Sequence, residues 1–543
     1  MNLPMHTTHQ SVFSPIAGIT WSTSLRRRTH FRTIQDLLDQ GELEPATLAA
    51  QALMSQAPYD IHALALMAQC LATKGDHLAA VQIYDRQLAQ QDSDVIWAAK
   101  AHSLAALGRH CLANTSFARA TALARSTRFL AEQAECLLVS GRLNDALTVL
   151  ETAPTTSKDD LPRQLVHTKI LIEKGKTHAA FNIASGIAIR DKTGRAICLA
   201  RQSKPTGIAF PTLCQQAISS LSTPHILAEI AWDHPQFIGT EQVGNLIQIT
   251  ADPKCGDSQK AHAHLALFRV HDQADDGFQA LAHLRNYHTL SAKNSGYRRS
   301  ADSALFTLLM QLKIAPLLAS KSKVLPIFIT GLPGSGRQLA QRVLVQAADC
   351  GPARALSVIP AIMSRFIRRV RERGITRIER QDLLNLQAKL REGLCQAASG
   401  SDVIVDTTAS NFKWSGLIAA ALPEARVVHM KADKMTTGWA LHKGGWIDPD
   451  FGCQHDLKQI QAFQHRSNAL MTHWEGRFAP NVMAISGDAL SRPSGATAQA
   501  MVEACELKWS SHCIQLPCNP DRSWHRYAAY LNPLRHTPRI SLI

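Results

Sequence analysis

The 543-residue sequence has no run of about 18 apolar, uncharged residues, which a membrane-spanning helix would need. Its 12 cysteines form no C-x-x-C pair and no metal-ligand spacing, so we expect reduced thiols, a cytoplasmic protein and no bound metal. The 24 histidines are equally dispersed. Met1–Ser24 lacks an apolar core preceded by positive charge, and we therefore expect no secretory signal peptide.

Acidic residues are scarce relative to basic ones. The 43 Asp and Glu against 58 Lys and Arg give a formal net charge of +15, which suits anionic partners such as nucleotides or acidic peptides. Between Arg365 and Arg380 lies a dense run of arginines, which predicts a solvated helix face, with an anion-binding patch as the alternative. With 45% hydrophobic residues, the chain is long enough for two or more domains with large cores.

Five glycines recur at nearly constant spacing in the N-terminal part of the chain. Gly41, Gly75, Gly108, Gly141 and Gly175 are separated by 34, 33, 33 and 34 residues. Five residues after each glycine stands an alanine, namely Ala46, Ala80, Ala113, Ala146 and Ala180. The period is that of the tetratricopeptide repeat (TPR), a helix pair in which the glycine relaxes the turn and the alanine lets the helices approach closely.

Prolines interrupt this register after about residue 190. We predict a leader at 1–30, TPR repeats at 31–190, an irregular helical solenoid and linker at 191–320, and an α/β domain at 321–543. Because stacked repeats form a concave surface that can bind an extended peptide, the expected partner is a peptide or protein acceptor. We expect no nucleic-acid partner and no membrane span.

The C-terminal part is organised around a glycine-rich turn. Ile327–Ile329 are typical of a strand buried on both faces, and apolar residues recur at helical spacing after residue 337. The turn between them reads Gly331-Leu-Pro-Gly-Ser-Gly-Arg-Gln338, so its amides and the helix N-terminus can bind a phosphate. Further strand candidates at 402–406 and 423–433 predict a parallel, doubly wound sheet with ligands at the strand carboxyl ends.

Three interpretations of this turn are open. The first is a tight connection that binds nothing. The second is a P-loop kinase or NTPase, although Arg337 stands where the pattern has lysine and Gln338 where it has the Ser or Thr that holds magnesium. The third is a loop that binds the phosphosulfate of 3′-phosphoadenosine 5′-phosphosulfate (PAPS).

The order of several motifs resembles the bacterial TPR sulfotransferases, relatives of the tyrosylprotein sulfotransferases. These motifs are G-L-P-G-S-G at 331–336, D-x-x-x-x-N at 406–411, G-L-I at 416–418 and L-P-E-A-R-V-V-H at 422–429. The resemblance implies a TPR solenoid followed by a P-loop-like α/β domain that uses PAPS to transfer a sulfuryl group to a hydroxyl acceptor, such as protein tyrosine. The alternatives are a catalytically inactive TPR scaffold for protein binding and a P-loop kinase.

The sequence departs from the family pattern at the cofactor site. The family loop reads G-x-P-R-S-G-T-T, and this chain has no arginine at its fourth position and no hydroxyls at its last two. The resemblance implies that cofactor binding involves Gly331, Pro333, Gly334, Ser335, Gly336, Arg337, Gln338, Lys431 and Lys434. Arg337 is the candidate catalytic residue, and either lysine would bind the 3′-phosphate. Residues 351–360, where relatives carry a glutamate base, contain no carboxylate, so no general base is predicted.

Overall fold

The computed structural model divides into two compact units, one ending at His167 and one beginning at Thr168. The domain boundaries expected near residues 190 and 320 stay predictions, and most of the expected leader lies outside the described residues. The structure describes residues 25–39, 42–107, 109–124, 126–139, 142–152, 160–174, 176–188, 190–191, 195–203, 209–220, 223–293, 297–318, 322–348, 355–398, 401–444, 449–492, 495–509 and 523–535.

The first unit is helical throughout its described part. Consecutive helices pack against one another and bury small apolar clusters between them. The helices are α1 (Leu25–Asp39), α2 (Leu43–Gln56), α3 (Ile61–Lys74), α4 (His77–Leu88), α5 (Asp94–Ala106), α6 (His110–Ala124), α7 (Thr127–Val139), α8 (Leu143–Glu151) and α9 (Leu161–Glu173), which continues into the second unit.

The repeat signature has a direct structural cause. All five predicted alanines are fully buried, so a larger side chain at these positions would push the packed helices apart. Gly75 ends α3 with a left-handed φ of 91°, which a glycine adopts without steric cost; the other four repeat glycines lie outside the described residues. The predicted helical-repeat architecture is therefore confirmed.

Helices continue through the first part of the second unit. They are α10 (Thr177–Ala188), α11 (Arg195–Gln202), α12 (Ala209–Ser220), α13 (Pro224–Asp233), α14 (Thr240–Ala251), α15 (Asp257–Gln273), α16 (Gly277–Ala292) and α17 (Arg299–Gln311). Proline opens α13 at its first turn, where the missing N–H removes no helical hydrogen bond. None of the described helices is both long and apolar enough to cross a membrane.

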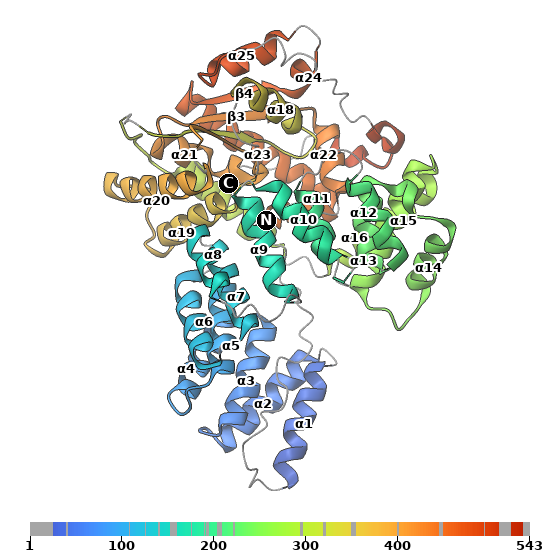
Figure 1. Cartoon of the computed structure of the whole chain (residues 1–543), viewed down its shortest axis with the longest axis vertical. Coiled ribbons are helices and arrows are strands. Elements are labelled where there is room, and N and C mark those ends of the chain that lie inside the picture. The colour runs from blue at the N-terminus through green and yellow to red at the C-terminus, as the bar shows by residue number, and fades with distance from the viewer. Residues whose placement is uncertain are drawn as a thin grey trace. The chain divides into compact units, whose positions relative to one another are not determined.

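A parallel sheet of four strands forms the centre of the C-terminal segment (Figure 1). The strand order is β2-β1-β3-β4, with β1 (Leu325–Thr330), β2 (Val403–Asp406), β3 (Arg426–Lys431) and β4 (Val482–Ser486). All pairs are parallel, so the carboxyl ends of the strands lie at one edge. The predicted strands β1 to β3 and the parallel α/β fold are confirmed, and β4 is an addition.

Helices cover both faces of this sheet. Ile329, Val428 and Met430 pack with apolar residues of α18 and α25 on one face, whereas His429 contacts α23 on the other. The helices of this segment are α18 (Arg337–Ala348), α19 (Val358–Glu372), α20 (Arg380–Ala398), α21 (Ser415–Ala421), α22 (Lys434–Lys443), α23 (Leu457–Phe478), α24 (Gly487–Leu490) and α25 (Ala496–Ala504).

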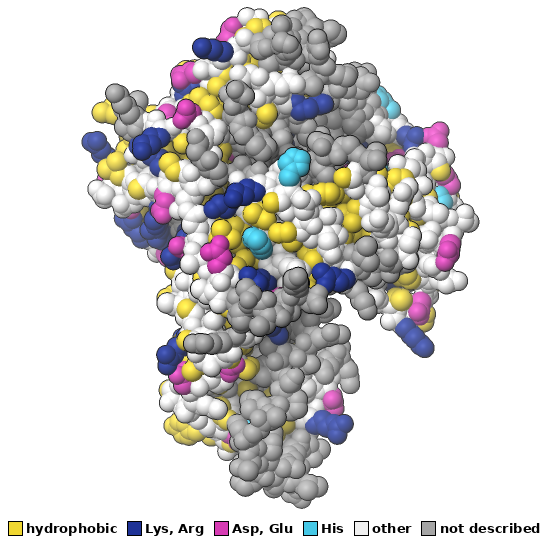
Figure 2. All heavy atoms as spheres, viewed as in Figure 1, with side chains coloured by type: hydrophobic (Ala, Val, Ile, Leu, Met, Phe, Trp, Pro, Cys, Tyr) yellow, Lys and Arg dark blue, Asp and Glu magenta, His cyan; other side chains and the backbone are white. Residues whose placement is uncertain are grey.

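The arginine-rich stretch spans α19 and the start of α20. Arg369, Arg371, Arg377 and Arg380 are exposed, and Lys and Arg side chains gather over these two helices in Figure 2. Arg373 Nη1 pairs with Asp382 Oδ2 at 2.8 Å. The exposed arginines therefore lie on a solvated helix face, as predicted, whereas Nε and Nη2 of Arg365 are buried.

Candidate functional site

The glycine-rich turn connects β1 to α18 at the carboxyl edge of the sheet. Gly331, Gly334 and Gly336 have φ values of 136°, 80° and 88°, which residues with side chains rarely adopt. Ser335 N donates to Leu332 O at 3.1 Å and closes the turn. The loop therefore reaches the N-terminus of α18 in a conformation that depends on its glycines.

Neighbouring segments approach this loop closely. A Cβ at Gly334 would lie 2.8 Å from Ala440 Cβ of α22, and one at Gly331 would lie 2.6 Å from Met430 O. A Cβ at Gly487 would likewise lie 2.4 Å from Ser335 O. Position 334, where the family pattern has arginine, is thus held against α22.

Arg337 is the first residue of α18, and its half-buried side chain turns toward the neighbouring strand. Its Nη1 donates to Thr407 O, directly after β2, at 2.9 Å. The guanidinium therefore lies at the sheet edge where parallel α/β folds bind ligands. Gln338, which follows it, is exposed, and Pro333 is half-buried.

Ser335 lies inside the turn. Its side chain is 1% exposed, and Oγ has no hydrogen-bond partner among the described residues. This hydroxyl lies beside Gly331, because a Cβ built there would be 2.8 Å from Ser335 Oγ. A buried hydroxyl without a hydrogen bond lowers the stability of the folded chain. A ligand that reaches the turn and accepts this hydrogen bond would remove that cost.

Asp406 ends β2 and accepts hydrogen bonds from the segment that follows Thr407, the residue that Arg337 contacts. Its Oδ1 accepts from Thr408 N at 2.8 Å, Thr408 Oγ1 at 2.6 Å and Leu356 N at 3.2 Å. Oδ2 accepts from Asn411 Nδ2 at 2.8 Å, which connects the two ends of the D-x-x-x-x-N motif. Burial raises the pKa of Asp406 to about 6, against the hydrogen bonds from Thr408 and Leu356, and the negative charge of Glu173 adds to the rise.

Glu173 brings a carboxylate to the segment in which the sequence shows none. This residue ends α9, and its Oε2 accepts a long hydrogen bond from Ser357 N at 3.4 Å. Leu356 N, one residue earlier, donates to Asp406. Glu173 and Asp406 therefore bind consecutive amides of the segment that enters α19.

Lys431 lies at the end of β3 and binds a carboxylate of α23. Its Nζ is 2.8 Å from Glu475 Oε2, and Glu475 Oε1 is 2.8 Å from His429 Nδ1. Burial tends to raise the pKa of Glu475, but the hydrogen bonds from His429 and Lys431 outweigh it and lower this pKa. The Lys431 side chain is 42% exposed, so its ammonium still reaches solvent.

Lys434 begins α22 and is exposed. Its ammonium donates to the carbonyl of Arg535, while Asp433 caps the helix by accepting from Met435 N and Thr436 N. The predicted site residues thus fall into two places. The Arg337 guanidinium lies beside the end of β2, whereas the two lysines lie at the end of β3 and the start of α22, and the loop approaches Met430 of β3 and Ala440 of α22.

Sequence reasoning missed Glu173, Glu475 and the carbonyl of Thr407. Glu173 precedes Ser357 by 184 residues, and its only sequence signal is its place at the end of a repeat helix. No sequence motif predicts the pairing of Glu475 with Lys431.

Residues 326–511 match the model of the sulfotransferase family. The chain therefore carries a sulfotransferase-like domain behind a mostly helical N-terminal region. An uncharacterized protein of Aquifex aeolicus (strain VF5) is 22% identical to this chain over 239 residues, which are 38% of this chain and 31% of that protein. The chain thus spans about a third of that relative's length.

Two solved structures are similar over long stretches. A tetratricopeptide repeat protein from Parabacteroides merdae has a TM-score of 0.31 and 11% identity, covering 50% of this chain and 94% of that protein. The APC/C hetero-tetramer Cut9-Hcn1 has a chain with a TM-score of 0.24 and 11% identity, covering 88% of this chain and 96% of its own. TM-scores this low carry no argument about function.

Proposed function

We propose that the C-terminal domain binds PAPS and transfers its sulfuryl group to a hydroxyl acceptor. The observation that carries this proposal is the glycine turn at the N-terminus of α18, with the Arg337 guanidinium fixed beside it. Backbone amides at a helix N-terminus stabilise anions, and an arginine adds a charge-assisted hydrogen bond.

The residues of the turn fit a phosphosulfate group. The amides of Gly336 and Gln338 would bind its oxygens, and the buried Ser335 hydroxyl has a hydrogen bond to give. Lys431 or Lys434 would bind the 3′-phosphate after β3. When bound, PAPS supplies the sulfuryl group, and the chain supplies positioning and charge stabilisation.

Glu173 is the proposed general base. Its carboxylate would take the proton of the acceptor hydroxyl as the acceptor oxygen forms its bond to sulfur and the bond from sulfur to the 5′-phosphate oxygen breaks. Adenosine 3′,5′-bisphosphate (PAP) then leaves as the anion, and Arg337 would stabilise the charge that develops on it. Asp406 is a positioning residue, because it holds the Leu356 amide next to the amide that contacts Glu173.

The repeats are proposed to bring a peptide or protein acceptor to this domain, with protein tyrosine as one acceptor. Stacked helical repeats commonly bind extended peptides. The exposed arginines of α19 and α20 would favour acidic segments next to the acceptor hydroxyl.

Isothermal titration of the full chain with PAP tests the cofactor site. We expect binding that weakens by roughly tenfold or more in Arg337→Ala, because a charge-assisted hydrogen bond contributes about 1.5–3 kcal/mol. Arg342→Ala, which removes an exposed arginine from the same helix, is the matched control. Magnesium-dependent ATP binding without PAP binding would instead support the P-loop kinase.

A second candidate is a non-catalytic scaffold that binds proteins through its repeats. The contact of Gly334 with Ala440 favours it, because α22 lies where the family pattern places an arginine side chain. Under this reading PAP does not bind, and neither Arg337→Ala nor Glu173→Gln changes the capture of a protein partner.

A further inference from the structure

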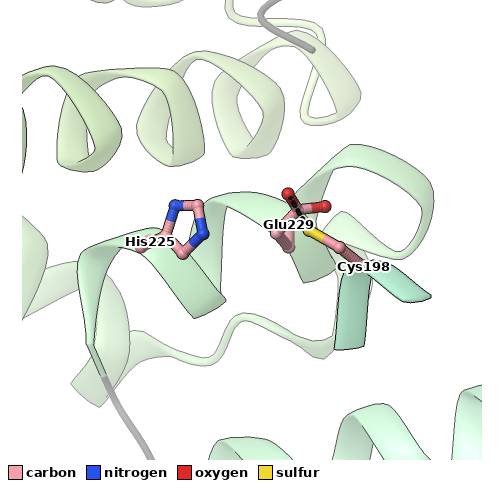
Figure 3. A group of neighbouring side chains, drawn as sticks. All are labelled: Cys198, His225 and Glu229. Atoms are coloured by element: carbon pink, nitrogen blue, oxygen red, sulfur yellow. Dashed lines mark hydrogen bonds between the residues drawn. The ribbon is translucent and has the colours of Figure 1, made fainter. Parts of the chain in front are cut away.

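A second cluster of reactive side chains lies in the helical part of the second unit, away from the glycine turn in sequence. Cys198 of α11 and His225 and Glu229 of α13 bring one ligand atom each within 4.8 Å of one another (Figure 3). From this arrangement we infer a zinc-binding site that joins α11 to α13. The inference is independent of the proposed transfer reaction.

The donor set is chemically suited to zinc. Thiolate sulfur, imidazole nitrogen and carboxylate oxygen are the three protein ligands that zinc prefers, and tetrahedral zinc places its ligand atoms roughly 3–4 Å apart. His225 and Glu229 are four residues apart and therefore lie on the same face of α13. The three ligand atoms would have to move by side-chain rotation to reach that spacing around one ion.

Two of the three proposed ligands are already in contact. Cys198 Sγ donates to Glu229 Oε1 at 2.5 Å, and these side chains are 6% and 1% exposed. Zinc would displace the thiol proton to solvent and would bind the thiolate and carboxylate together.

The surrounding charges accommodate the ion. Arg201 Nη1 lies 3.4 Å from Glu229 Oε2 and 3.6 Å from Asp233 Oδ2. Zinc with one thiolate and one carboxylate is neutral overall, and Arg201 keeps Asp233 as its partner. No uncompensated charge would be buried, which is the main cost of placing an ion in a protein interior.

A neighbouring ring, that of His262, also supports the orientation of the His225 side chain. The His262 ring packs edge-on against the His225 ring, with 4.6 Å between centroids, and its Nδ1 contacts Ser258 O at 2.7 Å. Three protein ligands leave one tetrahedral position, which a water molecule would occupy. The site is therefore a metal link between two helices that has one exchangeable ligand.

The test uses the full chain, stripped of metal with a chelator, dialysed and reloaded with zinc sulfate or cobalt chloride. We expect about one zinc ion per chain by elemental analysis, a thiolate-to-cobalt charge-transfer absorption, and a Tm that rises with zinc. Cys198→Ser and His225→Gln should each lose the absorption and the zinc-dependent rise in Tm. Cys214→Ala, which changes a buried cysteine of α12 outside the cluster, should keep both.

Two variants keep the test decisive if one fails to fold. Binding of less than a tenth of an ion per chain by the folded wild type would overturn the inference. So would zinc or cobalt binding that is unchanged in both folded variants, because the metal would then lie elsewhere. A thiol with no metal affinity would leave Cys198, Glu229 and Arg201 as a buried hydrogen-bonded and ionic cluster.

Discussion

Glu173 Oε2 lies 3.4 Å from the backbone nitrogen of Ser357, so the last residue of a repeat-type helix contacts the segment that enters α19. The same segment offers the Leu356 amide to Asp406 at the end of β2. Arg337 contacts Thr407, the residue after Asp406. A continuous set of contacts therefore connects the proposed base to the arginine beside the glycine turn.

Replacing Glu173 by Gln tests its role as the base. We expect sulfuryl transfer to fall by about 10²–10⁴-fold, because glutamine cannot accept the proton, while PAP affinity stays unchanged. Transfer from labelled PAPS to a hydroxyl acceptor and PAP titration give the two quantities. Glu392→Gln on the exposed side of α20 is the control. Full transfer activity in Glu173→Gln would remove Glu173 from the mechanism.

A binding experiment can decide whether Lys431 or Lys434 contacts the 3′-phosphate. If Lys431 binds that group, Lys431→Met should weaken PAP binding by roughly 10–150-fold, which corresponds to about 1.5–3 kcal/mol, and leave adenosine 5′-phosphate binding unchanged. Lys434→Met is the matched comparison. Equal losses for both nucleotides would show that the lysine does not contact the 3′-phosphate.

Gly334 tests whether α22 blocks the family's arginine position. Gly334→Ala should cost about 1–2 kcal/mol for the left-handed backbone and a further ~1–3 kcal/mol for the contact with Ala440. Gly374→Ala is the control, because Gly374 has a φ of 62° and nothing within 4 Å of its Cβ position. Urea unfolding of both variants measures the difference. Equal losses would show that α22 gives way to a side chain.

The fold was predictable where short-range patterns set it. The buried alanines repeat with the helix pairs, and the apolar runs of β1 and β3 match strands that are almost fully buried. The strand β4 was missed because its residues alternate between partly buried and exposed after Val482, which gives no continuous apolar run. The residue types of β4 alone do not reveal which face of the strand is exposed.

The candidate site was predictable only where its residues are adjacent in the chain. The glycine turn and Arg337 follow β1 directly, and the Asp406–Asn411 pair lies within six residues. The contacts that decide its chemistry join distant segments. Ala440 faces Gly334 from 106 residues away, and Glu475 pairs with Lys431 from 44 residues away. A single sequence contains no local signal for such pairs.

A cluster of three histidines, of which His288 and His442 are buried and His455 is half-buried, predicts acid sensitivity. The His288 and His442 rings stack with 4.0 Å between centroids, and His288 Nδ1 lies 3.0 Å from His455 Nδ1. Burial lowers the pKa of His442 and of His455 to about 4, and burial followed by the neighbouring imidazoles lowers that of His288 well below its usual value.

Because the unfolded chain protonates His442 and His455 near pH 6.5 and the folded chain protonates them only near pH 4, these two histidines contribute full stability above pH 6.5. That contribution falls between the two values at about 1.4 kcal/mol per pH unit for each imidazole and is lost below pH 4. Urea unfolding at pH 7, 6 and 5 should show this decline. His455→Gln should make it shallower by about 1 kcal/mol per pH unit, whereas His525→Gln, an exposed control, should not. An unchanged slope in His455→Gln would mean that other groups cause the acid sensitivity.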